Sequence, residues 1–298
     1  MNARLDQPLA QGEAARFFEV PGPAAMECLV ARFHTHAYKP HTHDDYVIGV
    51  VTAGHELFSV GRERGAAGAG DIILIDPGVV HDGAPAPGGY VYRMTYPGAA
   101  VLAEIAGDLA ERAMPAPHFP KALIHDAALA ARLVALHQAG DAGADRLALD
   151  QAMIGTMAAV MARHGAEQKR IAAGLQRPAG REAQATARAL DYLDSHYTEV
   201  VDLARLSAVA GLPRARLIRA LHRETGLTPH AWLTDRRVKA ARPLLAAGRS
   251  PAEVALDCGF CDQSHLNRAF KARVGVTPGA YQRAKGAGSG AFQAPMKA

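Results

Sequence analysis

Cysteine is scarce in this sequence, because only Cys28, Cys258 and Cys261 occur among its 298 residues. Three cysteines are too few for a disulfide framework, which fits a reducing compartment. Long apolar runs are also missing: no stretch offers about 18 uninterrupted apolar residues, so the sequence predicts no membrane-spanning helix. A secretory signal peptide has an apolar segment after a few basic residues, and the first residues of this sequence do not show that pattern. We therefore expect a cytoplasmic protein.

Acidic residues are sparse from Arg181 onward, where Lys and Arg outnumber Asp and Glu, whereas the part before it is mildly acidic. The boundary falls in the proline- and glycine-containing stretch GLQRPAGRE. A basic part joined to a mildly acidic one suggests a polyanion-binding module attached to a second domain. With 49% apolar and 21% charged residues the composition is that of a folded protein, and the length allows two domains.

The C-terminal third contains an internal repeat. Residues 203–232 align with residues 252–281, with Gly211 matched to Gly259, and both copies continue with Gly-x-Thr-Pro. One residue is gained inside the turn of the second copy. Because each copy is a single short unit repeated once, the pattern predicts two related subdomains rather than a long solenoid.

The local chemistry of each copy predicts a helix, a turn and a second helix. Asp202 is a suitable N-cap, Gly211 can end the first helix in the left-handed conformation, and Pro213 can begin the second helix. The second helix shows apolar residues on one face and arginines on the others. Such a helix fits the DNA major groove, where arginine binds guanine and neutralises phosphate. A solvated helix face is the alternative for one copy, and the matched second copy favours DNA.

Residues 186–284, above all DCGFCDQSHLNRAFKARVGVTPGAYQ, resemble the DNA-binding domain of the arabinose-regulator (AraC/XylS) family of transcription regulators. The resemblance implies two helix-turn-helix subdomains joined by a long helix at 229–247, with both recognition helices on one DNA face about one helical turn apart. Pro243 lies inside this linking helix and predicts a kink there or a helix that starts later. The C-x-x-C of Cys258 and Cys261 has no second pair and is interpreted as core packing.

The resemblance places base-reading positions on both recognition helices, of which Ala215 is too short to reach far into a groove. It assigns them to Ala215, Arg216, Arg219, Gln263, Ser264 and Arg268. Together with their exposed neighbours, the residues predicted to contact DNA are Arg214, Ala215, Arg216, Arg219, Asp262, Gln263, Ser264, His265, Asn267 and Arg268.

Short strand-like segments occupy residues 28–97, separated by Gly- and Asp-rich turns, and predict a sandwich or barrel. The segments HTHDDYVIGVVTAG and GDIILIDPGVVHDG resemble the first and second motifs of a cupin. The resemblance implies a small β-barrel with a pocket lined by His41, His43 and His81. A barrel of this kind, followed by helices and the tandem repeat, is similar in layout to the sugar-sensing members of the same family.

Metal-binding cupins carry a glutamate after their His-x-His, and in this sequence Val47 stands at that position, while Asp76 replaces the first proline of the second motif. We therefore predict a ligand pocket that requires no metal, with a divalent ion on His41, His43 and His81 as the alternative. The predicted ligand-binding residues are His41, His43, Tyr46, His81 and Arg93. If Arg93 points into the barrel it favours a carboxylate-bearing ligand; a surface arginine is the alternative.

Residues 126–164 are predicted to be helical, with Leu147, Ile154 and Met161 recurring every seven residues and Met157 between them. This spacing could form an antiparallel dimer seam. Packing of the helix on its own barrel is the alternative.

Taken together, these patterns predict an α+β multidomain protein. A cupin-like sensing and dimerisation domain (residues 1–165) precedes a linker (166–182), an all-α tandem helix-turn-helix domain (183–286) and a flexible tail (287–298). The predicted function is a ligand-responsive transcription regulator that binds double-stranded DNA and a small-molecule effector. A homodimer is a further expectation, as is contact with RNA polymerase if the output is activation. The alternative is a metal-dependent cupin enzyme with a DNA-binding appendage.

Overall fold

The computed structural model describes residues 9–20, 26–171 and 182–286. The chain divides into two compact units, Met1–Gly180 with Leu212–Leu217 and Arg181–Gly211 with Ile218–Ala298. Most of the predicted linker and the whole of the predicted tail lie outside the described residues. None of the helices in the described ranges is long and apolar enough to cross a membrane.

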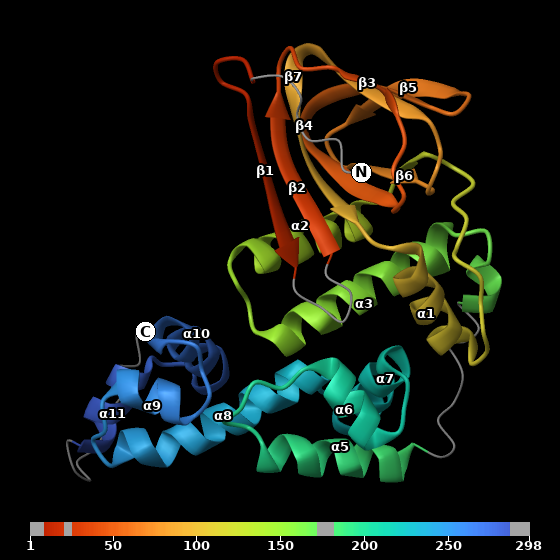
Figure 1. Cartoon of the computed structure of the whole chain (residues 1–298). Helices are drawn as coiled ribbons and strands as arrows, with labels where there is room; N and C mark the ends of the chain where they lie inside the picture. Colours follow the sequence, from red (N-terminus) through yellow and green to blue (C-terminus); the bar gives the residue numbers. More distant parts are fainter. Residues whose placement is uncertain (1–8, 21–25, 172–181, 287–298) are drawn as a thin grey trace, which may run out of the picture. The chain divides into compact units, whose positions relative to one another are not determined.

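The first unit is built on an antiparallel sheet that curls around a common interior (Figure 1). Its main path runs β1-β2-β7-β4-β6-β8, with β3 paired to β7 and β5 paired to β4. The strands are β1 (Ala14–Val20), β2 (Met26–Phe33), β3 (Tyr38–His41), β4 (Val47–Val60), β5 (Glu63–Gly68), β6 (Asp71–Ile75), β7 (His81–Tyr96) and β8 (Leu123–His125). This sheet confirms the predicted cupin-like β-barrel.

The long strand β4 carries two irregularities in its pairing with β7, between Val51 and Ala53 and between Gly54 and Glu56. Gly54 has a φ of +68°, and a Cβ there would lie 2.0 Å from the carbonyl oxygen of Gly89. Only glycine therefore allows the two strands to approach this closely. The irregular stretch shifts which side chains of β4 face the interior.

Three helices accompany the sheet in this unit: α1 (Ala99–Ala110), α2 (Ala127–Asp141) and α3 (Arg146–His164). Helix α2 packs on β1, β4 and β6, and α3 packs on α1 and α2. The helix predicted over 126–164 is thus two helices, separated by a turn in which Gly143 has a φ of +62°. Asp126 and Asp145 cap their N-termini through side-chain oxygens.

The residues of the predicted dimer seam are buried within the chain itself. Leu147, Ile154, Met157 and Met161 are at most 2% exposed. Asp150, which interrupts their spacing, is buried as well and accepts a hydrogen bond from Nε of Arg146 at 2.9 Å. The seam interpretation of these residues is therefore wrong, because their apolar surface is already used in packing α3 against its own unit.

The second unit is all-helical, with α5 (Ala183–Ser195), α6 (Leu203–Ala210), α7 (Arg214–Thr225), α8 (Pro229–Ala246), α9 (Pro251–Asp257), α10 (Gln263–Val274) and α11 (Pro278–Gly286). The pairs α6–α7 and α9–α10 are the two predicted helix-turn-helix copies, which α8 joins (Figure 1). Asp202 caps α6, and Gly211 ends it in the left-handed conformation, as predicted. Cys258 is buried with Phe260 and Leu266 in the core of the second copy, which agrees with its interpretation as core packing.

The repeated Gly-x-Thr-Pro has the same structural role in both copies. Gly226 and Gly275 follow α7 and α10 with φ values of +74° and +85°. The hydroxyls of Thr228 and Thr277 then accept hydrogen bonds from backbone amides three residues on, each at 3.4 Å. The motif therefore stops one helix and starts the next within four residues.

Helix α8 begins at Pro229 and continues through Pro243 to Ala246. The predicted alternative of a later start is therefore wrong.

Candidate functional site

The barrel encloses a small cavity that offers about 50 Å³ to the centres of water-sized molecules. Apolar side chains such as Val47, Phe58 and Ile73 form part of its wall, and His41 and His81 are among its polar residues. A mostly apolar wall with a few convergent polar groups is typical of small-molecule sites.

The three predicted histidines meet at one end of this cavity. His41, His43 and His81 each bring one ring nitrogen within 4.8 Å of the others. His41 is the last residue of β3, His43 lies in the segment that follows, and His81 is the first residue of β7. His41 and His81 lie side by side because they are paired across β3 and β7. Nε2 of His41 lies 3.2 Å from Nε2 of His43.

Backbone carbonyls determine which ring nitrogens carry protons. Nδ1 of His41 lies 2.8 Å from the carbonyl oxygen of Lys39, and Nδ1 of His81 lies 2.9 Å from that of Val79. A carbonyl only accepts, so both Nδ1 atoms donate, and in the neutral rings each Nε2 is an acceptor. His43 must therefore donate its Nε2 proton to His41 for the third contact to be a hydrogen bond.

Burial keeps two of these imidazoles neutral. It lowers the pKa of His43 to about 4, with the neighbouring His81 and His41 acting in the same direction. Burial also lowers the pKa of His81. At neutral pH His43 and His81 are thus neutral hydrogen-bonding groups.

The same cluster meets part of the needs of a metal ion. Three imidazoles, two of which have Nδ1 held by a backbone carbonyl, fit three ligands of a divalent ion. The position of the cupin carboxylate is occupied by Val47, which lines the cavity with an aliphatic side chain. Hydrogen bonds to carbonyls and between the rings of His41 and His43 already satisfy much of the cluster.

Two predicted ligand-binding residues lie outside the cavity wall. The hydroxyl of Tyr46 donates to the carbonyl oxygen of Pro117, and its ring packs against Phe119. Arg93 lies between Tyr92 and Met94 on β7, and both of these neighbours line the cavity. Because side chains alternate along a strand, Arg93 faces the other side of the sheet, near His137 of α2, and its Nη1 is buried there. Neither the inward position nor the surface alternative is therefore correct.

Glu56 was not anticipated from the sequence. This β4 residue is 5% exposed and lines the cavity. Burial raises the pKa of its carboxyl to about 8, and the neighbouring Tyr90 hydroxyl opposes part of this rise. Glu27 and Asp82 also line the cavity, which makes its carboxyl groups as numerous as its imidazoles.

The second recognition helix, α10, presents exposed side chains at Gln263, Ser264 and Arg268. Asp262 is exposed too, but its carboxylate caps the helix by accepting the backbone N–H of His265 at 2.7 Å. The ring of His265 meets the ring of Phe260 edge to face at 5.1 Å. These last two side chains therefore have structural roles.

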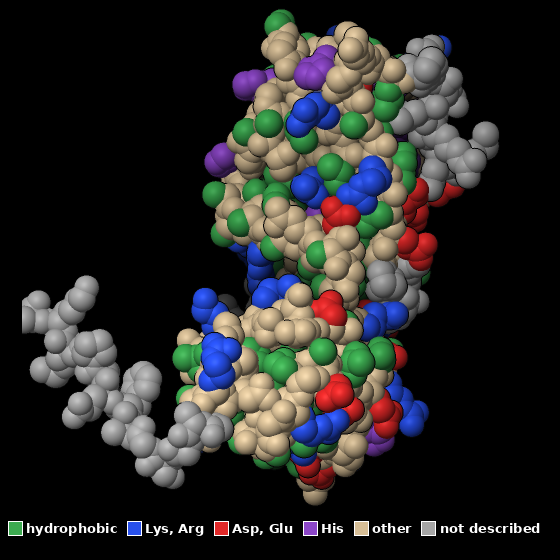
Figure 2. All heavy atoms as spheres, turned by 90° about the vertical axis from the view of Figure 1, so that its left-hand side faces the viewer, with side chains coloured by type: hydrophobic (Ala, Val, Ile, Leu, Met, Phe, Trp, Pro, Cys, Tyr) green, Lys and Arg blue, Asp and Glu red, His purple; other side chains and the backbone are tan. Residues whose placement is uncertain are grey.

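Asn267 is half-buried on α10, so the prediction that its side chain is exposed is wrong. In the first copy, Arg214, Ala215, Arg216 and Arg219 lie in the first two turns of α7. On the face drawn in Figure 2, Lys and Arg side chains are interspersed with acidic ones rather than gathered into one patch.

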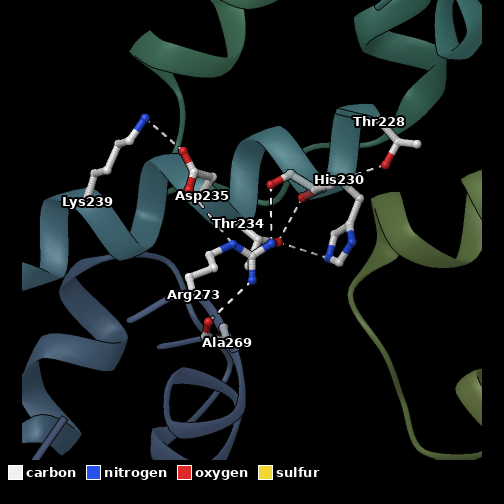
Figure 3. Close-up of polar contacts among 8 residues, drawn as sticks. Thr228, His230, Thr234, Asp235, Lys239, Ala269 and Arg273 are labelled. Atoms are coloured by element: carbon white, nitrogen blue, oxygen red, sulfur yellow. Dashed lines mark hydrogen bonds and ion pairs between the residues drawn. The ribbon is translucent and has the colours of Figure 1, made fainter. Parts of the chain in front are cut away.

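Helix α8 is attached to both helix-turn-helix copies by arginines. Arg237, 2% exposed, donates from Nε to the carbonyl oxygen of Tyr197 at 2.7 Å and from Nη2 to that of Glu199 at 2.9 Å, between α5 and α6. Arg273 of α10 donates to the carbonyl oxygen of Ala231 on α8 at 3.3 Å (Figure 3). These bonds help to fix the positions of the two copies along α8.

Asp235 of α8 adds to this attachment (Figure 3). Its carboxylate lies 4.0 Å from Nε of Arg273 and 2.8 Å from Nζ of Lys239. Arg273 also donates to the carbonyl oxygen of Ala269 within its own helix, at 3.3 Å. Its guanidinium is thus shared between α10 and α8.

A barrel with a mostly apolar internal cavity, joined to two helix-turn-helix subdomains, is the layout of ligand-responsive DNA-binding transcription regulators. Comparison with known proteins agrees. An AraC-like ligand binding domain matches residues 23–156, and a helix-turn-helix domain matches residues 206–284. The chain belongs to the AraC/XylS family of transcriptional regulators.

Individual relatives resemble different shares of the chain. The uncharacterized HTH-type transcriptional regulator YbfI of Bacillus subtilis is 25% identical over 234 residues, which is 76% of this chain and 80% of that protein. The transcriptional activator RhaS of Yersinia pestis is 36% identical over 90 residues, which is 30% of this chain and 33% of that protein. The solved DNA-binding domain of AdpA, in complex with a target DNA, is 32% identical, with a TM-score of 0.34 over 35% of this chain and 96% of that one.

Proposed function

We propose that a small organic molecule in the barrel cavity controls how the tandem helix-turn-helix unit binds its DNA site, and that this response needs neither metal nor catalysis. The observation that carries the proposal is the cavity itself, which lies inside the region that matches a ligand-binding domain. His41, His43 and His81 supply hydrogen-bond donors and acceptors for the ligand, and the aliphatic wall supplies apolar contact.

The DNA site is read by two recognition helices. Arg219 of α7 and Arg268 of α10 occupy matched places in the repeat, and each can form two bonds to a guanine. Because α8 holds both copies through Arg237 and Arg273, the two half-sites are expected at a fixed spacing of about one helical turn.

Replacement of His81 tests the role of the cavity. We expect His81→Ala to abolish the ligand response and to leave the DNA affinity of the ligand-free protein unchanged, because α10 and the greater part of α7 belong to the other unit. Fluorescence anisotropy of a labelled operator, with and without an effector found by screening, measures both quantities. His55→Ala is a matched control, since His55 is exposed on β4 and does not line the cavity. A full response in His81→Ala would contradict the proposal.

Metal content decides between the regulator and the enzyme alternative. Val47 cannot supply an anionic oxygen, so three neutral imidazoles would hold a divalent ion less firmly than three with a carboxylate. Protein purified without added metal is expected to contain far less than one equivalent of iron, nickel or zinc, and a chelator should leave the ligand response intact. Near one equivalent of metal together with loss of the response on chelation would make this a metal site, and turnover of a substrate would make it an enzyme.

A further inference from the structure

The cavity contains an acidic group without a partner. Oε2 of Glu56 is buried and makes no hydrogen bond with any residue that the structure describes. The hydroxyl of Tyr90 lies close enough to this carboxyl to lower its pKa, but no hydrogen bond of ordinary geometry joins the two groups. A buried polar group without a partner costs stability, so such a group in a cavity points to a ligand that completes it.

The opposite strand leaves room for this carboxyl. A Cβ on Gly83 of β7 would lie 2.3 Å from Oε1 of Glu56. Gly83 is not one of the glycines with a positive φ, so its backbone would accept alanine. Glycine at this position therefore provides space for the carboxyl rather than a special backbone conformation.

The charges of the cavity wall favour a cation. No lysine or arginine occurs among the described residues of the wall, whereas Glu27 and Asp82 join Glu56 there. Oδ1 of Asp82 is used by the backbone N–H of Ser59, at 2.9 Å. Burial keeps His43 and His81 neutral, so neither balances an ionised Glu56. A carboxylate-bearing ligand would meet three carboxyl groups and no lysine or arginine among the described residues of the wall.

Aromatic rings complete the wall. Tyr38, Tyr92 and Tyr96 line the cavity together with Phe17 and Phe58. Aromatic faces attract cations, and a carboxylate beside them strengthens this preference when water is excluded.

We infer that the effector of this cavity carries a positively charged nitrogen, as a protonated amine or a quaternary ammonium, which pairs with the Glu56 carboxylate between the aromatic rings. The remainder of the molecule extends toward the imidazoles of His41 and His81. This inference rests on the proposed function, because it names the chemical class of the ligand that the cavity senses.

Binding of a cation has a consequence for protons. With its pKa raised to about 8, Glu56 is protonated in most molecules at pH 7. The cation displaces this proton to the buffer, the O–H bond breaks, and the carboxylate left behind pairs with the nitrogen. The surrounding Tyr38 and Tyr90 hydroxyls keep their protons, since burial raises both pKa values, and His43 and His81 are already neutral.

The test varies the charged group on two carbon skeletons, each of which is called a body below. A four-carbon chain and a benzyl ring are each used with an ammonium, a hydroxyl or a carboxylate group, and binding to the full chain is measured by calorimetry at pH 7 in two buffers of different ionisation enthalpy. On at least one body the ammonium compound is expected to bind tenfold or more tightly than the other two and to release up to about one proton.

Three variants locate the effect. In Glu56→Gln the ammonium preference and the proton release should both disappear. Gly83→Ala should weaken the preference with Glu56 still present, because the new Cβ displaces the carboxyl. Glu19→Gln, the same change at an exposed residue of β1, should retain both. The inference is overturned if neither body shows an ammonium preference, absence of binding included, or if the preference survives in Glu56→Gln.

DNA binding separates this inference from the proposed function. If a molecule without a cationic nitrogen changes DNA affinity, and His81→Ala removes that change, the proposed function stands and the inference fails. If ammonium compounds show the Glu56-dependent preference while ligands of the cavity leave DNA affinity unchanged, the cavity binds amines and the proposed response is wrong.

Discussion

Glu56→Gln should make the first unit more stable, and the gain should depend on pH. The carboxyl pKa rises from its ordinary 4.5 to about 8 in the folded protein, chiefly because of burial. The folded state therefore holds this proton more tightly than the unfolded chain, and the stability of the native protein falls as pH rises from 4.5 to about 8. Glutamine is neutral throughout and does not lose this stability.

The size of the gain follows from the same two values. For each pH unit between 4.5 and 8, the free energy of unfolding of the native protein falls by about 1.4 kcal/mol. Glu56→Gln should therefore match the native protein near pH 4.5 and exceed its stability by about 3 kcal/mol at pH 7. Above pH 8 the difference should level off.

Urea unfolding from pH 5 to pH 9 measures this difference. Near-ultraviolet circular dichroism of the tyrosines follows mainly the first unit, where five of the eight tyrosines lie: Tyr38, Tyr46, Tyr90, Tyr92 and Tyr96. The single tryptophan, in the second unit, provides a fluorescence signal whose transition should not change. The reasoning would be refuted if the stability difference between variant and native protein were the same at pH 5 and pH 8. Such a constant difference would come from the way the amide packs, which does not depend on pH.

Further predictions concern the second unit. Residues 182–286 alone should bind duplex DNA, with an affinity that falls steeply with salt because counterions are released; a folded fragment without salt-sensitive binding would contradict this. Arg219→Ala and Arg268→Ala should each cost about 1–3 kcal/mol on the cognate site and relax preference at one base pair, whereas an equal loss on all sequences would indicate phosphate contacts. Arg237→Met should destabilise this unit by about 2–4 kcal/mol, since it leaves the carbonyls of Tyr197 and Glu199 without their donor; an unchanged tryptophan unfolding transition would contradict it.

The second unit could be predicted closely because its boundaries depend on local chemistry. Asp202, Gly211 and the threonines of Gly-x-Thr-Pro act on backbone groups within a few residues, so their spacing alone indicates where helices start and end. The break at Gly143 was missed because the segments on both sides have helical patterns. The burial of Met157 could not be predicted from spacing, since packing on α1 and α2 and packing on a second chain require the same apolar repeat.

The cavity was predicted only in part, and strand register explains the difference. Strict alternation from Val47, which faces the interior, would place odd-numbered residues of β4 inside and Glu56 outside. The irregular pairing around Gly54 reverses this alternation, so that Glu56, Phe58 and Val60 line the cavity. A bulge has only a weak sequence signal, here a glycine at a position of positive φ. Glu56, the residue that most constrains the ligand, thus faces the cavity because of a backbone irregularity. A change that restores regular pairing at Gly54 should turn the Glu56 carboxyl out of the cavity although Glu56 itself is unchanged.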